Sequence, residues 1–169
     1  MVKRMRKESL QGDMKFISLL EKMGCTVSWE RDGRQNLWLK GPDGKLKGME
    51  VKMSDFSDQA LTLAAIAPFA DSEVTIKGIA HIRGQESDRI KVIVDELAKM
   101  GILCNELPDG VKIHPGTPKN TNIETYNDHR VAMSFAVTGL AGDGMTILNP
   151  MCCKKTFAGF FDEIDRLEE

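Results

Sequence analysis

Two stretches of the chain place apolar residues at helical spacing and then end in the same way. Residues 16–24 (FISLLEKMG) and residues 93–101 (IVDELAKMG) both finish on Lys-Met-Gly, and a short apolar stretch follows each of them. Apolar positions three and four residues apart form one face of a helix, and glycine commonly ends a helix. The pattern predicts two similar amphipathic helices, each followed by a strand.

A second pair of stretches shares another pattern. Residues 57–78 and residues 127–149 each begin with a polar pair, continue through small apolar residues, and finish with a turn and a strand, VTI in the first and MTI in the second. The part that reads TLAAIAPFA is apolar on nearly all sides, which predicts a buried helix.

Two strand pairs complete the pattern. A turn near RDGR divides TVSWERDGRQNLWLK, and PDG divides ILCNELPDGVKI, as turn residues do between two strands. The order helix, strand pair, helix, strand thus occurs twice, in residues 12–80 and 81–150. We expect the repeats to pack as one body, because a repeat seldom buries its apolar face alone.

The alternation of helices and strands predicts an α+β fold with α/β alternation. Residues 155–169 are expected to form a terminal helix that begins a third repeat, within a folded part that spans residues 9–169. Residues 1–8 are basic but contain no apolar run, so we interpret them as a disordered or vector-derived N-terminal segment and not as a secretory signal.

Composition narrows the class of protein. The chain of 169 residues is 41% hydrophobic and 28% charged, the profile of a soluble globular domain. Its formal net charge of −2 argues against a nucleic-acid binder, and without a run of about 18 apolar residues no membrane span is expected. Four cysteines without a Cys-x-x-Cys pair and three scattered histidines predict no metal site and reduced thiols in the cytoplasm.

Polar residues mark the predicted helix starts, because their side chains accept hydrogen bonds from free backbone N–H groups. The five starts lie near Gly12-Asp13, Ser57-Asp58, Ser87-Asp88, Asn127-Asp128 and Thr156. Capping is therefore one interpretation of Asp58, Asp88 and Asp128, and a role in a functional site is the other.

Three basic residues do not fit the capping pattern. Arg89, Arg130 and Lys155 each lie at or beside a predicted helix start, where a cation opposes the helix dipole by roughly 0.3–1 kcal/mol. Helix N-termini attract anions, and arginine offers a bidentate fork suited to carboxylate or phosphate. If the helices run parallel, the three cations can converge on one anionic ligand.

Glu86 directly precedes one of these helix starts and has two interpretations. It can form an ion pair with Arg89, three positions further along. It can also take part in catalysis, because a carboxylate that neighbouring cations keep ionised still accepts a proton transiently from a bound hydroxyl. Asp58 can accept a proton in the same way.

Four motifs in the chain resemble one known family. SDQALTLAAIAPFA, IRGQESDRIKVIVDELAKMG, TYNDHRVAMSFAVTGL and TILNPMCCKKTFAGFF occur in the order and with spacing similar to the C-terminal part of the 5-enolpyruvylshikimate-3-phosphate (EPSP) synthases, the 3-phosphoshikimate 1-carboxyvinyltransferases. The resemblance covers roughly residues 9–167. It implies about two copies of a βαβαββ unit plus a terminal helix, the enolpyruvyl transferase fold, in part of a C-terminal lobe whose partner is a missing N-terminal lobe.

The resemblance also implies a reaction. This family transfers the carboxyvinyl group of phosphoenolpyruvate to the 5-hydroxyl of shikimate 3-phosphate and releases phosphate, a transferase step toward chorismate and the aromatic amino acids. It needs no metal or organic cofactor. A chain that carries only part of one lobe is expected to be inactive alone.

The resemblance implies roles for five residues in this chemistry. Asp58 matches the general base near the 5-hydroxyl, and Glu86 matches a glutamate that transfers protons during addition and elimination. The cations that would hold phosphoenolpyruvate are Arg89, Arg130 and Lys155.

Four further residues concern the rest of the site. Asp128 and His129 complete the Asp-His-Arg motif as support, with His129 orienting its neighbours. Gln85 stands where the family normally has a lysine that contacts the shikimate moiety, and His81 stands where some members have an asparagine that contacts it too. An amide hydrogen-bonds a hydroxyl but offers no charge, so shikimate 3-phosphate binding through Gln85 and His81 is an expectation in which both residues depart from the family's pattern.

Two other functions remain open from the sequence. One is the related carboxyvinyltransferase that acts on UDP-N-acetylglucosamine, although the positions of NDHR and ESDR favour the shikimate enzyme. The other is a non-catalytic module that binds anions or takes part in assembly, in which the carboxylates only cap helices.

Overall fold

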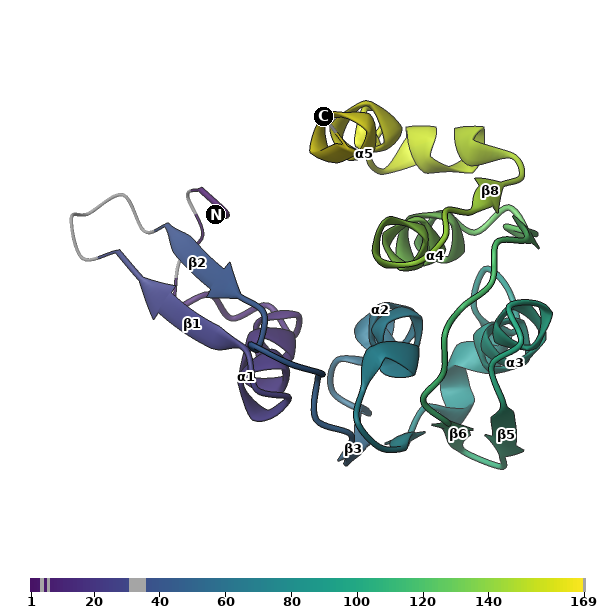
Figure 1. Cartoon of the computed structure of the whole chain (residues 1–169), viewed down its shortest axis with the longest axis horizontal. Helices are drawn as coiled ribbons and strands as arrows, with labels where there is room; N and C mark the ends of the chain where they lie inside the picture. The colour runs from purple at the N-terminus through teal and green to yellow at the C-terminus, as the bar shows by residue number, and fades with distance from the viewer. Residues whose placement is uncertain (4, 6, 31–35, 169) are drawn as a thin grey trace.

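A computed structural model describes residues 1–3, 5, 7–30 and 36–168 of the chain, and within them short strands alternate with helices (Figure 1). The α-helices are α1 (Met14–Lys22), α2 (Ala60–Ile66), α3 (Arg89–Lys99), α4 (His129–Ala141) and α5 (Phe160–Glu168). The strands are β1 (Thr26–Trp29), β2 (Leu37–Lys40), β3 (Glu50–Lys52), β4 (Val74–Lys77), β5 (Cys104–Leu107), β6 (Gly110–Ile113), β7 (Asn122–Ile123) and β8 (Thr146–Ile147). Four 3-10 helices join them: η1 (Ser57–Gln59), η2 (Ala67–Phe69), η3 (Ala80–Gly84) and η4 (Pro150–Lys155).

Residues 50–113 form one complete βαβαββ unit, with the elements β3, α2, β4, α3, β5 and β6 in that order. Its mixed sheet has the order β3-β4-β6-β5, in which β3 and β4 are parallel and the other neighbours are antiparallel. The predicted strand pair at PDG is the hairpin β5–β6. Gly110 is required there, because a Cβ atom would lie 1.9 Å from the carbonyl oxygen of Ile76. The α+β fold class is therefore confirmed.

The elements on either side repeat parts of this unit. Before it, α1 and the antiparallel pair β1–β2 have the order of α3, β5 and β6. After it, β7, α4 and the parallel strand β8 have the order of β3, α2 and β4. The predicted turn at RDGR lies outside the described residues. Strands β3 and β7 were not predicted, because each is defined by its pairing with a distant strand, β4 or β8.

The shared Lys-Met-Gly endings form the same helix terminus twice. Gly24 and Gly101 both adopt a left-handed φ, at 101° and 80°. After α3, the N–H of Gly101 donates to the carbonyl of Ala98 and the N–H of the next residue donates to Leu97, and the same pair of bonds closes α1. This Schellman arrangement satisfies the free carbonyls at a helix end and favours glycine at its left-handed position, which confirms the predicted terminators.

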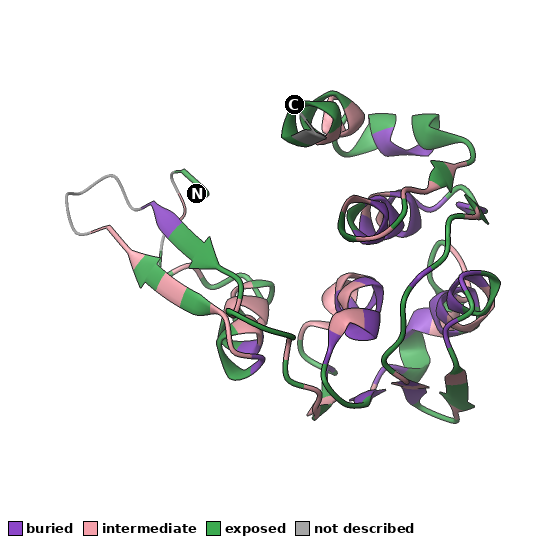
Figure 2. Ribbon diagram, viewed as in Figure 1, coloured by how far each residue is buried: buried purple, intermediate pink, exposed green. Residues whose placement is uncertain are grey.

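Helix α2 packs against both α3 and α4, and it lies below α4 and beside α3 in Figure 1. Its residues Leu63, Ala64 and Ala65 are completely buried, and Figure 2 shows buried positions on all three helices. The Thr138 hydroxyl on α4 donates to the carbonyl of Ala65 over 2.9 Å. The predicted burial of this alanine-rich helix is confirmed, and small side chains allow its neighbours to approach closely.

The two ends of the chain differ from expectation. Helix α5 begins at Phe160 and not at 155, because η4 ends at Lys155 and Gly159, a poor helix former, directly precedes α5. Thr156 therefore closes a 3-10 helix and does not cap an α-helix. Near the other end, Val2 exchanges two backbone hydrogen bonds of 2.8 Å with Leu37, within the segment expected to be disordered. None of the described helices is long and apolar enough for a membrane span.

Candidate functional site

The N-terminal ends of α2, α3 and α4 meet at one place. Asp58 lies in η1, which leads into α2, while Arg89 is the first residue of α3 and Arg130 is the second of α4. The Asp58 carboxylate accepts from Arg130 Nη2 over 3.0 Å and from Arg89 Nη1 over 3.5 Å. The three helices therefore bring their N-termini together, which is the condition for converging cations.

A buried ion pair joins α3 to α4. Arg89, whose side chain is 4% exposed, donates from Nε to Asp128 Oδ2 over 2.8 Å and from Nη2 to Oδ1 over 3.3 Å. Asp128 also accepts from the Ser87 hydroxyl over 3.0 Å and from the backbone N–H of Arg130 over 2.9 Å. Capping of α4 by Asp128 is thus confirmed, and the same carboxylate also orients Arg89.

These bonds decide the charge state of Asp128. Burial acts to raise its pKa, but the bond and charge of Arg89, with the Arg130 N–H and the Ser87 hydroxyl, outweigh burial and lower the pKa below its usual value. Donors aimed at a carboxylate stabilise its ionised form. Asp128 is therefore a fixed negative charge beside Arg89.

The other capping interpretations have different outcomes. Asp88 caps α3, because its Oδ1 accepts from the N–H of Lys91 over 3.1 Å. Asp58 makes no such bond to its helix within the described chain and contacts the two arginines instead. Asp13 precedes α1 without a side-chain cap bond. Capping is thus confirmed for Asp88 and wrong for Asp58.

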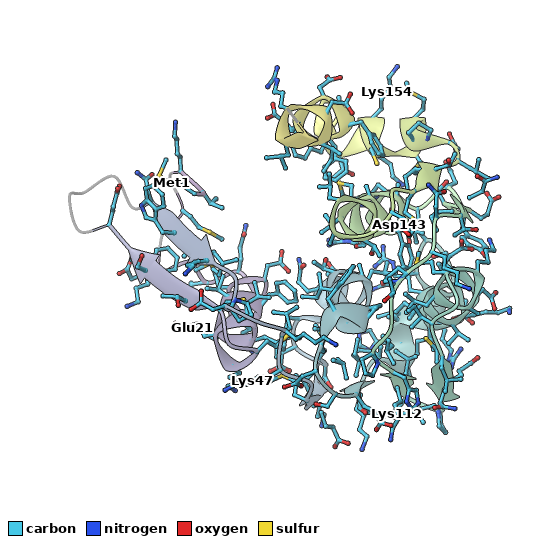
Figure 3. The ribbon with its side chains drawn as sticks, viewed as in Figure 1. Met1, Glu21, Lys47, Lys112, Asp143 and Lys154 are labelled. Carbon is cyan, nitrogen blue, oxygen red and sulfur yellow. The ribbon has the colours of Figure 1, made fainter. Side chains whose placement is uncertain are left out.

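Glu86 lies in a second, more open ion pair. Its Oε1 accepts from Lys155 Nζ over 3.0 Å, and its Oε2 lies 3.1 Å from Nδ1 of His129. The alternative of a Glu86–Arg89 ion pair is wrong, because Asp128 occupies the arginine and both Glu86 oxygens face other partners. Lys155 is half exposed, and Figure 3 shows its neighbour Lys154 pointing away from helix α4.

The position of Lys155 corrects one expectation. It ends the 3-10 helix η4 and does not start an α-helix. What brings it to the site is the packing of η4 on α4, where Cys153 Sγ contacts the carbonyl oxygen of His129 at 3.8 Å. Of the three predicted cations, only Arg89 and Arg130 therefore lie at helix N-termini.

Gln85 and His81 both flank this cluster on η3 and its end. Gln85 accepts a short hydrogen bond from Arg89 Nη1, and His81 Nε2 lies 2.7 Å from the Ser57 hydroxyl, beside Asp58. Both side chains therefore lie in the same cluster as the charged residues. Their contact with shikimate 3-phosphate stays a prediction.

Two hollows flank the charged residues. One, of about 460 Å³, is lined by Asp58 together with residues 11–13 and 54–57. The other, of about 260 Å³, contains Arg130 with Gln59 and Phe160. A more apolar groove of about 520 Å³ between α4, η4 and α5 contains none of the predicted site residues. Among the predicted site residues, Asp58 and Arg130 thus line hollows, and the Glu86–Lys155 pair is partly exposed to solvent.

The donor set favours an anion over a metal. Glu86, Asp128 and His129 bring possible ligand atoms within 4.8 Å of one another. However, Arg89 already occupies both Asp128 oxygens, and Lys155 lies on Glu86. A metal cation there would face positive charges already in place, whereas cations at helix N-termini suit an anionic ligand.

The supporting contacts of three residues were not predicted from the sequence. Ser87 donates to Asp128, Ser57 contacts His81, and Glu96 on α3 accepts from the Tyr126 hydroxyl just before α4. The signal for Glu96 was available: it is a carboxylate between Ile93 and Leu97 on the apolar face of its helix, where an acid needs partners.

The fold places the chain among the enolpyruvyl transferases. It is similar to a solved EPSP synthase from Acinetobacter baumannii, with a TM-score of 0.78 and 29% identity over 89% of this chain and 38% of that one. The fold alone is shared with the enolpyruvyl transferase NikO from Streptomyces tendae, at a TM-score of 0.71 and 21% identity over 90% of this chain and 34% of that one.

Sequence comparison gives the family. The EPSP synthase (3-phosphoshikimate 1-carboxyvinyltransferase) family model matches residues 1–164, so the chain belongs to that family. A 3-phosphoshikimate 1-carboxyvinyltransferase of Nostoc punctiforme is 45% identical over 99% of this chain and 38% of the relative, and one of Trichormus variabilis is 44% identical over 95% and 37%. The chain thus spans less than two fifths of the length of these relatives.

Proposed function

We propose that the chain supplies the phosphoenolpyruvate-binding side of a 3-phosphoshikimate 1-carboxyvinyltransferase. The whole protein would transfer the carboxyvinyl group of phosphoenolpyruvate to the 5-hydroxyl of shikimate 3-phosphate. The observation that carries the proposal is the convergence of Arg89 and Arg130 at helix N-termini, with Lys155 nearby, around the carboxylates of Asp58 and Glu86. A small, doubly anionic ligand suits this charge pattern.

Ligand anions would replace protein carboxylates on the accessible cations. Arg130 is paired with Asp58, and Lys155 with Glu86, in contacts of 3.0 Å that are partly open to solvent. The phosphate and carboxylate of phosphoenolpyruvate would take over these contacts. Arg89 would reach the ligand through Nη1, because its Nε and Nη2 remain on Asp128.

The displaced carboxylates would then be available for proton transfer. Asp58 would accept the proton of the 5-hydroxyl as the hydroxyl oxygen attacks C2 of phosphoenolpyruvate, and Glu86 in its protonated form would deliver its proton to the methylene carbon. The Glu86 carboxylate then takes a proton back from the new methyl group of the tetrahedral intermediate, the C2–O bond to phosphate breaks, and the carboxyvinyl double bond is restored. His129 would hold Glu86 Oε2 and so fix the direction of this transfer.

Four free cysteines suit a reducing compartment, and we place the reaction in the cytoplasm.

The shikimate moiety would lie near Gln85 and His81, opposite groups supplied by a partner lobe. Since the chain spans 38% of the Nostoc punctiforme relative, the complete site would need that remaining part.

The test is to join this chain to the part of the Nostoc punctiforme relative that it does not match. The joined protein should release phosphate only when both substrates are present, and this chain alone should release none. Arg130→Ala should raise the KM for phosphoenolpyruvate by about 30-fold or more, since losing one partner of a charge pair costs about 2 kcal/mol or more. Arg166→Ala, an exposed arginine on α5 paired with Glu163, is the matched control and should change the KM less than twofold.

Two results would contradict the proposal. Phosphate release by this chain alone would show that no partner lobe is needed. A folded joined protein that binds phosphoenolpyruvate but never releases phosphate would favour the non-catalytic anion-binding module.

A further inference from the structure

A strained turn immediately precedes the Asp-His-Arg motif. Tyr126 and Asn127 have φ values of 52° and 56°, two successive non-glycine residues in the left-handed region. Asparagine tolerates this conformation, but a bulky residue such as tyrosine rarely adopts it. The turn sets the direction in which α4 begins, so something must hold it in place.

Glu96 on α3 holds this turn through two hydrogen bonds. Its side chain is completely buried. Oε1 accepts from the Tyr126 hydroxyl over 2.8 Å, and Oε2 accepts from the backbone N–H of Glu124 over 3.2 Å. One carboxylate therefore holds the chain at both ends of a three-residue segment, and the carbonyl of Thr125 inside it accepts from the Asp128 N–H over 2.8 Å.

The charges around Glu96 maintain this arrangement. Lys99 Nζ lies 2.7 Å from Oε1 and 3.0 Å from Oε2, so the buried carboxylate has a cation beside it. Burial first, and then the bond and charge of Glu96, raise the pKa of Tyr126. The phenol thus stays protonated near neutral pH and donates its hydrogen bond to Glu96.

We propose that Glu96 is a positioning residue for the candidate site, acting through the Tyr126–Asn127 turn on Asp128, His129 and Arg130. It touches none of the groups assigned to phosphoenolpyruvate or to proton transfer. Its effect passes through the backbone, because the turn fixes where α4 starts and therefore where Asp128 meets Arg89 and where His129 meets Glu86. The effect on substrate binding rests on the proposed function, whereas the effect on geometry does not.

Two substitutions isolate the contact. Tyr126→Phe removes only the hydroxyl that reaches Glu96, and Glu96→Gln keeps the size of the side chain but removes its charge. Asp95→Asn is the matched control, because Asp95 is the adjacent acid on α3 and its carboxylate accepts hydrogen bonds from Lys91 and not from the turn. Should Glu96→Gln fail to fold, Tyr126→Phe still decides.

Proton NMR of the histidine rings in this chain is the primary measurement. Tyr126→Phe and Glu96→Gln should shift or broaden the His129 ring signals relative to the unsubstituted chain, and Asp95→Asn should not. His114, bonded to Asn105 in the β5–β6 hairpin, serves as an internal reference whose signals stay in place. A role in overall stability alone would leave the folded-state signals of His129 unchanged.

The joined protein gives the second measurement. Tyr126→Phe should raise the KM for phosphoenolpyruvate about three- to tenfold with a smaller change in kcat, as expected when binding groups are displaced slightly. His129 signals that superimpose on those of the unsubstituted chain in both variants would overturn the proposal. If the unsubstituted joined protein does not use phosphoenolpyruvate, the proposed function is wrong. The NMR measurement still tests whether Glu96 positions His129.

Discussion

The candidate site contains two carboxylate–cation contacts that differ in almost every physical respect. Arg89 and Asp128 are buried, joined by two bonds, and supported by Ser87 and a backbone N–H. Glu86 and Lys155 are joined by one bond, and half of the lysine side chain is exposed to solvent. The first contact connects two helices of the core, whereas the second connects a loop to a 3-10 helix.

The difference distinguishes a contact that holds the fold together from a contact that a ligand can replace. Opening the buried pair would leave a desolvated charge without its partner, which costs several kcal/mol. Opening the exposed pair costs little, because water replaces the lost contact. We infer that Asp128 keeps Arg89 in place while Lys155 exchanges its carboxylate for a ligand anion. Arg130, partly exposed and paired with the half-exposed Asp58, resembles Lys155 in this respect.

Breaking the buried pair should have the largest effect on stability. Asp128→Asn retains a side chain that can cap α4 but leaves the buried Arg89 charge with only the longer contact of 3.5 Å to Asp58 as a counter-ion. We expect the free energy of unfolding to fall by about 3–5 kcal/mol, measured by urea denaturation near neutral pH. A loss below about 1 kcal/mol would show that the pair is not a framework element.

The same pair should make the protein sensitive to acid. The folded pKa of Asp128 is lowered, so its stabilising contribution is complete above the unfolded value of about 3.9 and is lost as pH falls through the lower folded value. Stability should therefore decline below about pH 4. The urea midpoint should fall less between pH 6 and pH 3 in Asp128→Asn than in the unsubstituted chain. An equal fall in the two proteins would contradict the assignment of this acid sensitivity to Asp128.

Much of the fold could be predicted from the sequence because its signals are local. The Lys-Met-Gly endings depend on backbone conformation at Gly24 and Gly101, and the hairpin turn at PDG depends on residues within it. Strands β3 and β7 could not be predicted, because they exist only through pairing with distant β4 and β8. The start of α5 was misplaced because the 3-10 helix η4 has no strong sequence pattern.

The sequence predicted the residues that cluster at the candidate site, but not which residue pairs with which. Arg89 has Glu86 three positions away in sequence, yet it pairs with Asp128, 39 positions away. Lys155 was assigned to a helix start, although the packing of η4 on α4 is what places it beside Glu86. Local spacing suggests a partner on the same helix, whereas the fold brings a better one from another element.

Breaking the exposed Glu86–Lys155 pair should have the smallest effect on stability. The result tests whether this pair differs from the buried Arg89–Asp128 pair as we infer. Lys155→Ala should change the free energy of unfolding by no more than about 0.5 kcal/mol, since exposed ion pairs contribute little. Lys154→Ala is the matched control, because it removes an equal charge from the adjacent exposed position. In the joined protein, Lys155→Ala alone should weaken phosphoenolpyruvate binding, measured by calorimetry. Equal affinities for the two variants would mean that the exposed pair is a surface contact, and only Arg89 and Arg130 would remain as candidates for the ligand's anions.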